Sequence, residues 1–371
     1  MSHRLLRLLF ALLVAIGGLA TSGFGPPTLT ESDSASTPVS STVLKQMRAD
    51  RQPQVSAAAA VVMDADSGQV VFEKDSHAHR APASTTKMTT ALVTLENAHL
   101  TDIVTAGPNV KNVEPTIIGL DPGDTLTVEQ LLYGLLLPSG NDAAVALAEH
   151  VGGTEAGFAT MMNAKVAQLG LKDTHYVTPH GLDSPGHYSS AYDLALTARA
   201  AFKNPIFEKI VATKEYRIEG PVKWYFKNGN RLLDTFSGAD GVKTGYTDDA
   251  GACLVASATR NGHRAIAVVL NSQDTTGDSA ALLEYFFSRY SWEPVRAGNS
   301  QLSVYAQGDE TRRLTIAPQP DMVVQNWQKP YLRWFFSVPA APAQGDGSSG
   351  TVTYYLFGRK VAELELRADG G

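Results

Sequence analysis

Three short stretches of this 371-residue chain carry side chains that could act together in nucleophilic catalysis. In the first, Ser84 and Lys87 stand three positions apart, in a run whose apolar residues recur at helical spacing. Residues three apart share one face of a helix, so the lysine amine would lie within reach of the serine hydroxyl. A serine is a weak nucleophile until a neighbouring base takes its proton, and a lysine can be that base when burial or a second cation lowers its pKa. We therefore expect an activated serine at the start of a helix.

The second and third stretches add groups that would complete such a site. The second has the pattern Ser-x-Asn, in which Ser139 could relay a proton to a leaving amine and Asn141 could hold a substrate carbonyl. The third is Lys-Thr-Gly and begins at Lys243. Two ammonium groups close together lower each other's proton affinity, so Lys243 would help Lys87 to act as a base. Each stretch alone also fits an ordinary turn or strand end, and only the combination predicts an enzyme.

The third stretch is predicted to lie on a strand. Gly245 has no side chain that would keep a substrate backbone from lying against that strand as an added strand. Alternation along the strand places Thr244 and Tyr246 on one face. The backbone amide of Tyr246 could then point toward an oxyanion formed at Ser84, which predicts an oxyanion hole there.

Helices must hold the first two stretches in place. Thr127 and Gln130 form a possible capping box before a strongly apolar run, which Pro138 and Gly140 end. Helical composition resumes directly afterwards, so the Ser-x-Asn stretch is predicted to lie on a short turn between two buried helices. Further helices are predicted over residues 154–169, from Ser190 onward, and over residues 279–290.

Strands are predicted on both sides of these helices. Residues 60–72 are predicted to form one hairpin. A second hairpin is predicted where two apolar runs flank Asn261-Gly262, a strong two-residue hairpin signal. A hairpin, a group of helices, a second hairpin and a closing helix predict an α+β body over residues 51–293.

The remaining segments differ from this body in composition. Residues 299–371 offer short strand-like runs and no convincing helix, so we predict a small all-β second domain. Residues 1–22 combine a basic head, an apolar run and a small-residue exit, which predicts a secretory signal peptide. An uncleaved membrane anchor is the less favoured reading, because the apolar run is short for a span. Residues 23–50 are rich in Ser, Thr, Pro and Gly and are predicted to be a flexible linker.

Composition limits the classes of function. The net charge of −6 and the pI near 5.9 argue against a nucleic-acid binder, as does the absence of a basic run interleaved with aromatic residues. Hydrophobic residues make up 43% of the chain, enough for a sizeable core. The single cysteine, Cys253, cannot form an internal disulfide, and its apolar neighbours predict a buried structural thiol.

The three motifs, in this order, resemble the set found in serine enzymes that react with penicillin. The likeness extends to their flanking residues and to Pro179-His180-Gly181-Leu182-Asp183. Over about residues 50–290 the chain resembles the low-molecular-mass D-alanyl-D-alanine carboxypeptidases, which are penicillin-binding proteins of the bacterial envelope. The resemblance implies a β-lactamase/transpeptidase-like sheet with a helical cluster, and residues 299–371 resemble the family's β-rich C-terminal domain more weakly.

The resemblance implies an exported serine peptidase of the periplasm or extracellular cell envelope. It would remove the terminal D-alanine of peptidoglycan pentapeptide stems through an acyl-enzyme, would be acylated by β-lactams, and would need no metal or other cofactor. Membrane association stays open. His180 matches a family histidine near the pocket, with an auxiliary role and a structural role both open. The roles that the resemblance assigns are the nucleophile Ser84, its base Lys87, the second element Ser139 and Asn141, the substrate-binding residues Lys243, Thr244 and Gly245, and the oxyanion-hole amides of Ser84 and Tyr246.

The same residues can be compared with four other functions. A class A β-lactamase would carry Glu-x-x-x-Asn after the second motif, and Glu155 and Asn163 lack that spacing. A D,D-endopeptidase that cuts peptidoglycan cross-links would use the same catalytic groups and stays open. A zinc peptidase could use His175, His180 and His187, but no His-Glu-x-x-His pattern supports it. The intact motifs argue against a binding module that has lost its chemistry.

Overall fold

The predicted signal peptide lies outside the residues that the computed structural model describes, as does most of the predicted linker. The last part of that linker is described and forms helix α2 (Ser41–Ala49), in which Val43 is buried. The prediction of a flexible linker is therefore wrong for these residues, because a short helix-forming run follows the Ser- and Thr-rich segment. The described residues are 40–49, 51–219, 224–295, 304–307, 310–316, 320–337 and 348–368.

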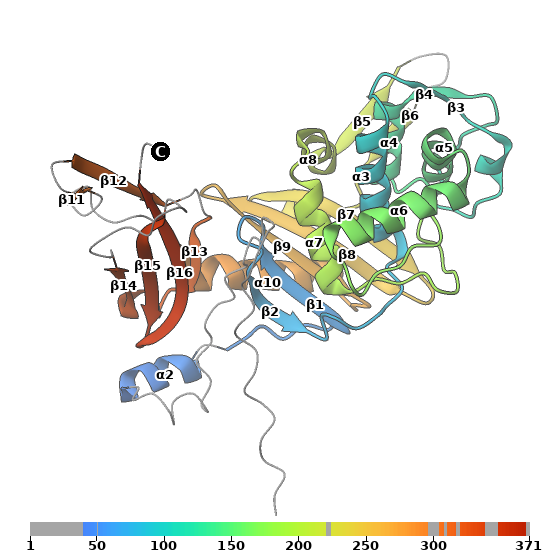
Figure 1. Cartoon of the computed structure of the whole chain (residues 1–371). Coiled ribbons are helices and arrows are strands. Elements are labelled where there is room, and N and C mark those ends of the chain that lie inside the picture. Colours follow the sequence, from blue (N-terminus) through green and yellow to red (C-terminus); the bar gives the residue numbers. More distant parts are fainter. Residues whose placement is uncertain are drawn as a thin grey trace, which may run out of the picture.

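An antiparallel five-stranded sheet with the order β2-β1-β9-β8-β7 lies at the centre of the α+β part of the chain (Figure 1). Strand β1 (Ala59–Asp64) pairs with both β2 (Val70–Lys74) and β9 (His263–Leu270), so strands from the two ends of this part lie together. Strand β8 (Gly251–Arg260) joins β9 to β7 (Ala239–Thr247). Strand β7, which carries the Lys-Thr-Gly motif, is therefore an edge strand.

Both predicted hairpins are confirmed. Asn261-Gly262 has φ angles of 53° and 84°, the positive values that a tight two-residue hairpin turn favours. Side chains of β1 alternate between two cores. Val61 and Met63 belong to the core under the helical cluster, whereas Ala60 and Val62 belong to the core on the opposite face. The sheet is thus buried on both faces.

Helix α10 (Thr275–Arg289) covers the face opposite the cluster and buries Leu282 and Phe286 against the sheet. The predicted closing helix is therefore confirmed, but it begins four residues earlier than residue 279. The Asp274 side chain accepts a hydrogen bond from the Gly277 amide and caps the earlier start.

A cluster of helices covers the other face of the sheet (Figure 1). The predicted capping box is confirmed, since Thr127 and Gln130 exchange side-chain to backbone hydrogen bonds. Thr154 and Ser190 cap the two following predicted helices, since their side chains accept from the amides of Gly157 and Asp193. The helices on this side are α3 (Lys87–Asn97), α4 (Val128–Leu136), α5 (Asn141–Gly152), α6 (Glu155–Leu169), α7 (Ala191–Ala201) and α8 (Pro205–Ala212), with the single turn α9 (Leu232–Thr235) before β7.

Two small antiparallel ribbons at the periphery were not predicted. Strand β3 (Ile103–Thr105) pairs with β4 (Thr125–Thr127), and β5 (Glu215–Ile218) pairs with β6 (Trp224–Lys227). Each strand has three or four residues, which is too short for a clear period-two pattern in the sequence.

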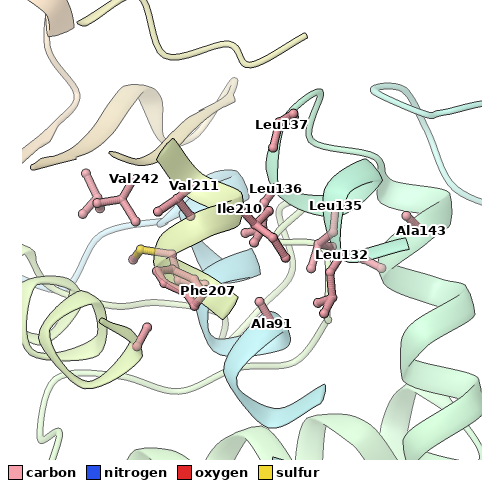
Figure 2. Close-up of a cluster of buried hydrophobic side chains, with 14 of the residues drawn as sticks. Ala91, Leu132, Leu135, Leu136, Leu137, Ala143, Phe207, Ile210, Val211 and Val242 are labelled. Atoms are coloured by element: carbon pink, nitrogen blue, oxygen red, sulfur yellow. The ribbon is translucent and has the colours of Figure 1, made fainter. Parts of the chain in front are cut away.

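Apolar residues beside each motif pack into one shared core. Figure 2 shows part of this core, in which Ala91 on α3, Leu137 after α4, Ala143 on α5 and Val242 on β7 belong to one buried cluster with residues of α8 such as Phe207. Each of the first four lies within a few positions of a motif residue. Because protein interiors are tightly packed, this core fixes the three motifs relative to one another.

The C-terminal part is all-β, as predicted, among the described residues after 295, apart from the 3₁₀ turn η3 (Lys329–Tyr331). Strand β10 (Tyr290–Glu293) pairs with β13 (Met322–Gln325), so the two parts of the chain share a ribbon. The domain division between residues 293 and 299 stays a prediction. The second sheet follows the order β11 (Val304–Gln307), β12 (Glu310–Ile316), β16 (Arg359–Ala368), β15 (Ser348–Leu356) and β14 (Leu332–Ser337).

Across the residues described here, every helix is too short or too polar to pass through a bilayer.

Candidate active site

Ser84 and Lys87 meet where the 3₁₀ turn η1 (Ala83–Thr86) leads into α3. The distance from Lys87 Nζ to Ser84 Oγ is 2.8 Å, so the predicted contact is present. The α-helix itself begins at Lys87, and the prediction that it starts near Ser84 is corrected by one 3₁₀ turn. The contact persists because side chains at i and i+3 also align in a 3₁₀ turn.

Lys87 is held by two carbonyl oxygens as well as by the serine. Its amine donates to Asn141 Oδ1 at 2.6 Å and to the backbone oxygen of His180 at 2.8 Å. The side chain is buried, with 0% of its surface exposed. Groups from η1, α5 and the segment before α7 therefore converge on one amine of α3.

The pKa of Lys87 lies well below 10.5. Burial is the largest cause, the positive charge of Lys243 is the second, and the Asp142 carboxylate acts in the opposite direction. Both causes expected from the sequence, burial and a second cation, therefore lower the pKa of Lys87, and burial is the larger. Removal of the amine from water disfavours its charged form more strongly than the second cation does.

The contacts of Lys87 suit a neutral amine that accepts a proton from serine. A neutral amine has two hydrogens and one lone pair, whereas an ammonium has three hydrogens and no acceptor. The oxygens of Asn141 and His180 can only accept, so they take two hydrogens. The third direction faces Ser84 Oγ, where the lone pair of the neutral amine would receive the hydroxyl proton.

The Ser-x-Asn stretch forms the predicted turn between two buried helices. Ser139 adopts a left-handed backbone, with φ of 73°, and its hydroxyl is buried with no hydrogen-bond partner among the described residues. Asn141 is the first residue of α5 and donates its amide to the backbone oxygen of Glu114 at 2.8 Å. The amide nitrogen has a second N–H, so the expectation that Asn141 holds a substrate carbonyl stays a prediction.

Lys243 is buried on β7, with 1% of its surface exposed. Its amine donates to the backbone oxygen of Thr244 at 3.0 Å, and Thr244 Oγ1 lies 3.5 Å away. Burial lowers the pKa of Lys243 to about 7. A carboxylate placed beside this amine would favour its charged form, so substrate binding and protonation would support each other.

Gly245 brings the strand close to the nucleophile. A Cβ built on this residue would lie 3.1 Å from the backbone nitrogen of Ser84 and 3.1 Å from Ala83 Cβ. The missing side chain therefore lets β7 pack against η1, and the role of Gly245 beside a substrate strand stays a prediction. The next residue, Tyr246, is 66% exposed at the edge of the sheet.

His180 is buried, and its backbone oxygen rather than its imidazole ring contacts Lys87. Its Nδ1 accepts from the Leu182 amide at 3.1 Å, and its Nε2 lies 3.5 Å from a carboxylate oxygen of Glu155. The ring contacts are those of a positioned side chain, while the backbone oxygen reaches Lys87.

The other two histidines considered for zinc are engaged elsewhere. His175 Nδ1 bonds to the backbone oxygen of Gly186 at 2.8 Å. His187 accepts from the Val177 amide at 3.0 Å through Nδ1, while its Nε2 lies 2.9 Å from Thr86 Oγ1. Within the described ranges, no group of three or more His, Cys, Asp or Glu side chains could hold a metal ion.

Two supporting residues were missed at the level of sequence. The buried Asp142 carboxylate accepts from the amides of Ile118, Gly119 and Leu120 and so holds the loop that packs beside the second motif. Asp183 accepts from Thr247 at the end of β7. Asp142 follows Asn141, and Asp183 ends the Pro179–Asp183 stretch, but their hydrogen-bond partners lie far away in the chain and cannot be identified from residue types.

Cys253 lies buried on β8, as predicted. Its burial raises the pKa of the thiol to about 11. The thiol therefore stays protonated and unreactive near neutral pH.

Comparison with known proteins yields close matches in sequence. The family model described as D-alanyl-D-alanine carboxypeptidase, peptidase S11, matches residues 46–274. D-alanyl-D-alanine carboxypeptidase DacF of Bacillus subtilis is 38% identical over 257 residues, which cover 67% of this chain and 66% of DacF. D-alanyl-D-alanine carboxypeptidase DacA of Escherichia coli K12 is 33% identical over 336 residues, which cover 85% of this chain and 83% of DacA.

Solved structures with the same fold agree with these matches. Penicillin binding protein 5 from Haemophilus influenzae superposes with a TM-score of 0.74 at 30% identity, covering 86% of this chain and 98% of that protein. The Streptomyces K15 DD-transpeptidase superposes with a TM-score of 0.62 at 35% identity, covering 64% of this chain and 99% of that protein.

Proposed function

Because the chain belongs to the D-alanyl-D-alanine carboxypeptidase family, peptidase S11, we propose that it is a serine peptidase that removes the terminal D-alanine from peptidoglycan stem peptides. The observation that carries this proposal is the buried Lys87 amine, 2.8 Å from Ser84 Oγ, whose other directions face two carbonyl oxygens. A lysine in this setting is a base for serine.

The reaction has two halves. Ser84 Oγ attacks the carbonyl carbon between the two D-alanines, and its proton passes to Lys87. The C–N bond then breaks and free D-alanine leaves after its amine has gained a proton through Ser139, whose buried hydroxyl has no other partner among the described residues. In the second half, water attacks the ester carbonyl, gives its proton to the Lys87 amine, and releases the shortened peptide. Ser84 regains its proton.

Lys243 and Thr244 would bind the substrate's terminal carboxylate. Both lie on an edge strand, where an extended peptide could add beside β7. The backbone amides of Ser84 and Tyr246 would stabilise the negative charge on the attacked carbonyl oxygen. The close packing of Gly245 on the Ser84 backbone supports this assignment, because it brings the two chain segments together.

The setting of the proposed activity is the bacterial cell envelope. We place the protein in the periplasm or outside the membrane, on the basis of the predicted signal peptide and of relatives named for D-alanyl-D-alanine carboxypeptidase activity. A β-lactam would acylate Ser84 by the same attack, since the ring amide takes the place of the peptide bond.

A D,D-endopeptidase reaction on cross-linked peptides remains the alternative. It uses the same acyl-enzyme, but the leaving amine belongs to a second peptide rather than to free D-alanine. Incubation of the purified protein with pentapeptide and with cross-linked muropeptides, followed by mass analysis of the products, separates the two. We expect release of free D-alanine to be the faster reaction.

Benzylpenicillin labelling tests the nucleophile. Intact-protein mass spectrometry is expected to find one covalent adduct on the wild-type chain, located on Ser84, and none on Ser84→Ala. Ser139→Ala serves as a second serine variant and should still acquire the adduct, more slowly. Labelling that survives the Ser84 substitution would refute the assignment.

A further inference from the structure

The segment Pro179 to Asp183 touches the catalytic elements at successive points. The hydroxyl of Thr90 on α3 donates to the backbone oxygen of Pro179 at 2.5 Å, and Lys87 donates to that of His180 at 2.8 Å. Gly181 has φ of +86°, and a Cβ at this position would overlap the backbone oxygen of Ala83. The segment is therefore packed tightly against α3 and η1.

At its end the segment reaches the other catalytic element, strand β7. Asp183 Oδ1 accepts from Thr247 Oγ1 at 2.6 Å, and Asp183 Oδ2 accepts from the Asp249 amide at 3.3 Å. The Thr247 hydroxyl in turn accepts from the Ala250 amide at 3.2 Å, and Thr247 is only 9% exposed. Asp183 thus joins the end of β7 to a segment that is itself joined to the nucleophile.

Tyr246 lies between two contacts that restrict the backbone. On one side Gly245 packs on η1, and on the other Thr247 is bound by Asp183. The Tyr246 side chain is 66% exposed and lies on an edge strand, so side-chain packing contributes little to its position. Tyr246 is paired with Ala252 of β8 on the inner side of the strand, so the outer, unpaired side of its backbone is held by the contacts of its two neighbours in the chain.

We propose that Asp183 is a positioning residue that, through Thr247, holds the Tyr246 amide in register with the Ser84 amide. This inference rests on the proposed function, in which those two amides form the oxyanion hole. Asp183 does not touch the substrate. It acts by linking the Pro179–Asp183 segment, which is fixed to α3 and η1 at one end, to strand β7 at the other.

Loss of the hydrogen bond between Asp183 and Thr247 should have a measurable consequence. A misplaced oxyanion donor weakens transition-state stabilisation and leaves ground-state binding nearly unchanged. Removal of the hydrogen bond should therefore lower kcat for release of D-alanine and slow acylation by benzylpenicillin, while KM changes little. We expect Asp183→Ala and Thr247→Val each to slow both reactions by about tenfold to a hundredfold, the cost of a small shift in catalytic geometry.

Three further variants separate positioning from general stability. Thr247→Ser keeps the hydroxyl and should restore most of the rate. The double variant Asp183→Ala/Thr247→Val should be no slower than either single variant, because both remove the same bond. Thr174→Val is the matched control: it deletes a Thr hydroxyl that donates to an Asp193 carboxylate oxygen at 2.8 Å, away from β7. Its acylation rate should match the wild type even where its melting temperature falls.

The outcomes are distinguishable. If the wild type is not acylated at Ser84, the proposed function fails and the positioning role fails with it. If the wild type is acylated and Thr247→Val, folded by circular dichroism, matches its rate, only the positioning role is overturned. A rise in KM at constant kcat, or a rate loss shared by Thr174→Val, overturns it as well.

Discussion

The charge state of Lys87 determines whether Ser84 can react. Its amine faces three oxygens, and a neutral amine satisfies all three only when Ser84 supplies the hydrogen of the third contact. Burial makes this neutral form accessible, and Lys243 adds to the effect. The Asp142 carboxylate, which accepts hydrogen bonds from backbone amides, raises the pKa of Lys87 and so has the opposite effect. The pKa of Lys87 therefore reflects one large effect, burial, and two smaller and opposing effects, from Lys243 and Asp142.

Replacement of Lys243 by glutamine should move the pH dependence of acylation. Without the second positive charge, the pKa of Lys87 rises, so less of the neutral base is present at a given pH. The acid limb of the benzylpenicillin acylation profile should therefore shift to higher pH. The shift should be modest, because burial, the larger cause, is unchanged. Stopped-flow acylation between pH 5 and 9 measures it.

The control for this prediction is Lys209→Gln, which removes an equal charge from an exposed site. Its acid limb should coincide with that of the wild type. A profile for Lys243→Gln that keeps its midpoint, whatever its height, would contradict the coupling between the two lysines.

His187 should make stability depend on pH below neutrality. Burial lowers its pKa to about 4, with smaller contributions in the same direction from His180 and His175, while Asp183 opposes them. Between pH 6.5 and about 4 the unfolded chain binds a proton that the folded chain does not, so stability falls as the pH falls. The loss from this residue should approach about 3 kcal/mol at pH 4. Urea unfolding at a series of pH values measures it.

A variant without the titrating ring isolates this contribution. His187→Gln should have a lower stability at pH 7, since Thr86 and the Val177 amide lose their partner, but a flatter dependence on pH from 6.5 down to 4. His150→Gln, which replaces an exposed histidine, should keep the wild-type slope. Equal slopes in all three proteins would show that His187 is not the group responsible.

At the scale of elements, the site depends on how closely β7 approaches η1. Gly245→Ala places a Cβ 3.1 Å from the Ser84 nitrogen, tighter than ordinary contact, so the strand or the turn must shift by a few tenths of an ångström. We expect acylation to slow by about tenfold or more, with the fold retained. Kinetics of benzylpenicillin labelling and a thermal melt provide the two measurements.

A second glycine provides the comparison. Gly107→Ala would place its Cβ 2.7 Å from an oxygen of the Glu149 carboxylate, which is the end of a flexible side chain and can move aside. Its acylation rate should remain that of the wild type. If Gly245→Ala reacts as fast as Gly107→Ala, the close approach of β7 to η1 is not required for catalysis.

Local signals made several elements predictable from the sequence. The capping box at Thr127 and Gln130, the caps at Thr154 and Ser190, and the turn at Asn261-Gly262 all act between residues that are near in the chain. The contact between Ser84 and Lys87 belongs to the same class, which is why spacing alone indicated it.

What the sequence did not indicate depends on distant contacts. The role of Gly245 is set by Ala83 and Ser84, which come from a different element, and no local pattern encodes that approach. His180 binds Lys87 through its backbone oxygen, so the residue type at position 180 gives no signal of this contact. Burial and repulsion between the lysines could both be anticipated, but the structure was required to show that burial lowers the pKa of Lys87 more.

At the scale of the whole molecule, the C-terminal β strands are joined to the α+β part around β13, which lies next to α10 (Figure 1). Strand β10 pairs with β13, and the side chain of Gln69 donates to the backbone oxygen of Val323 at 2.8 Å. Val323 is itself fully buried in the same core as Leu282 and Phe286 of α10. Part of the core behind the catalytic sheet is therefore built from the C-terminal region.

This arrangement predicts that a substitution in β13 destabilises the catalytic part. Val323→Ala removes two methyl groups from a packed core, at a cost of about 1 to 3 kcal/mol. Val352→Ala makes the same change at a fully buried position in the core of the C-terminal sheet, whose cluster contains no residue of α10.

Benzylpenicillin labelling of Ser84 at increasing urea reports the unfolding of the catalytic part alone. The labelling midpoint should fall for Val323→Ala and stay close to the wild type for Val352→Ala. Equal falls would mean that both parts unfold as one cooperative unit, and an unchanged midpoint in Val323→Ala would mean that the catalytic core does not depend on β13.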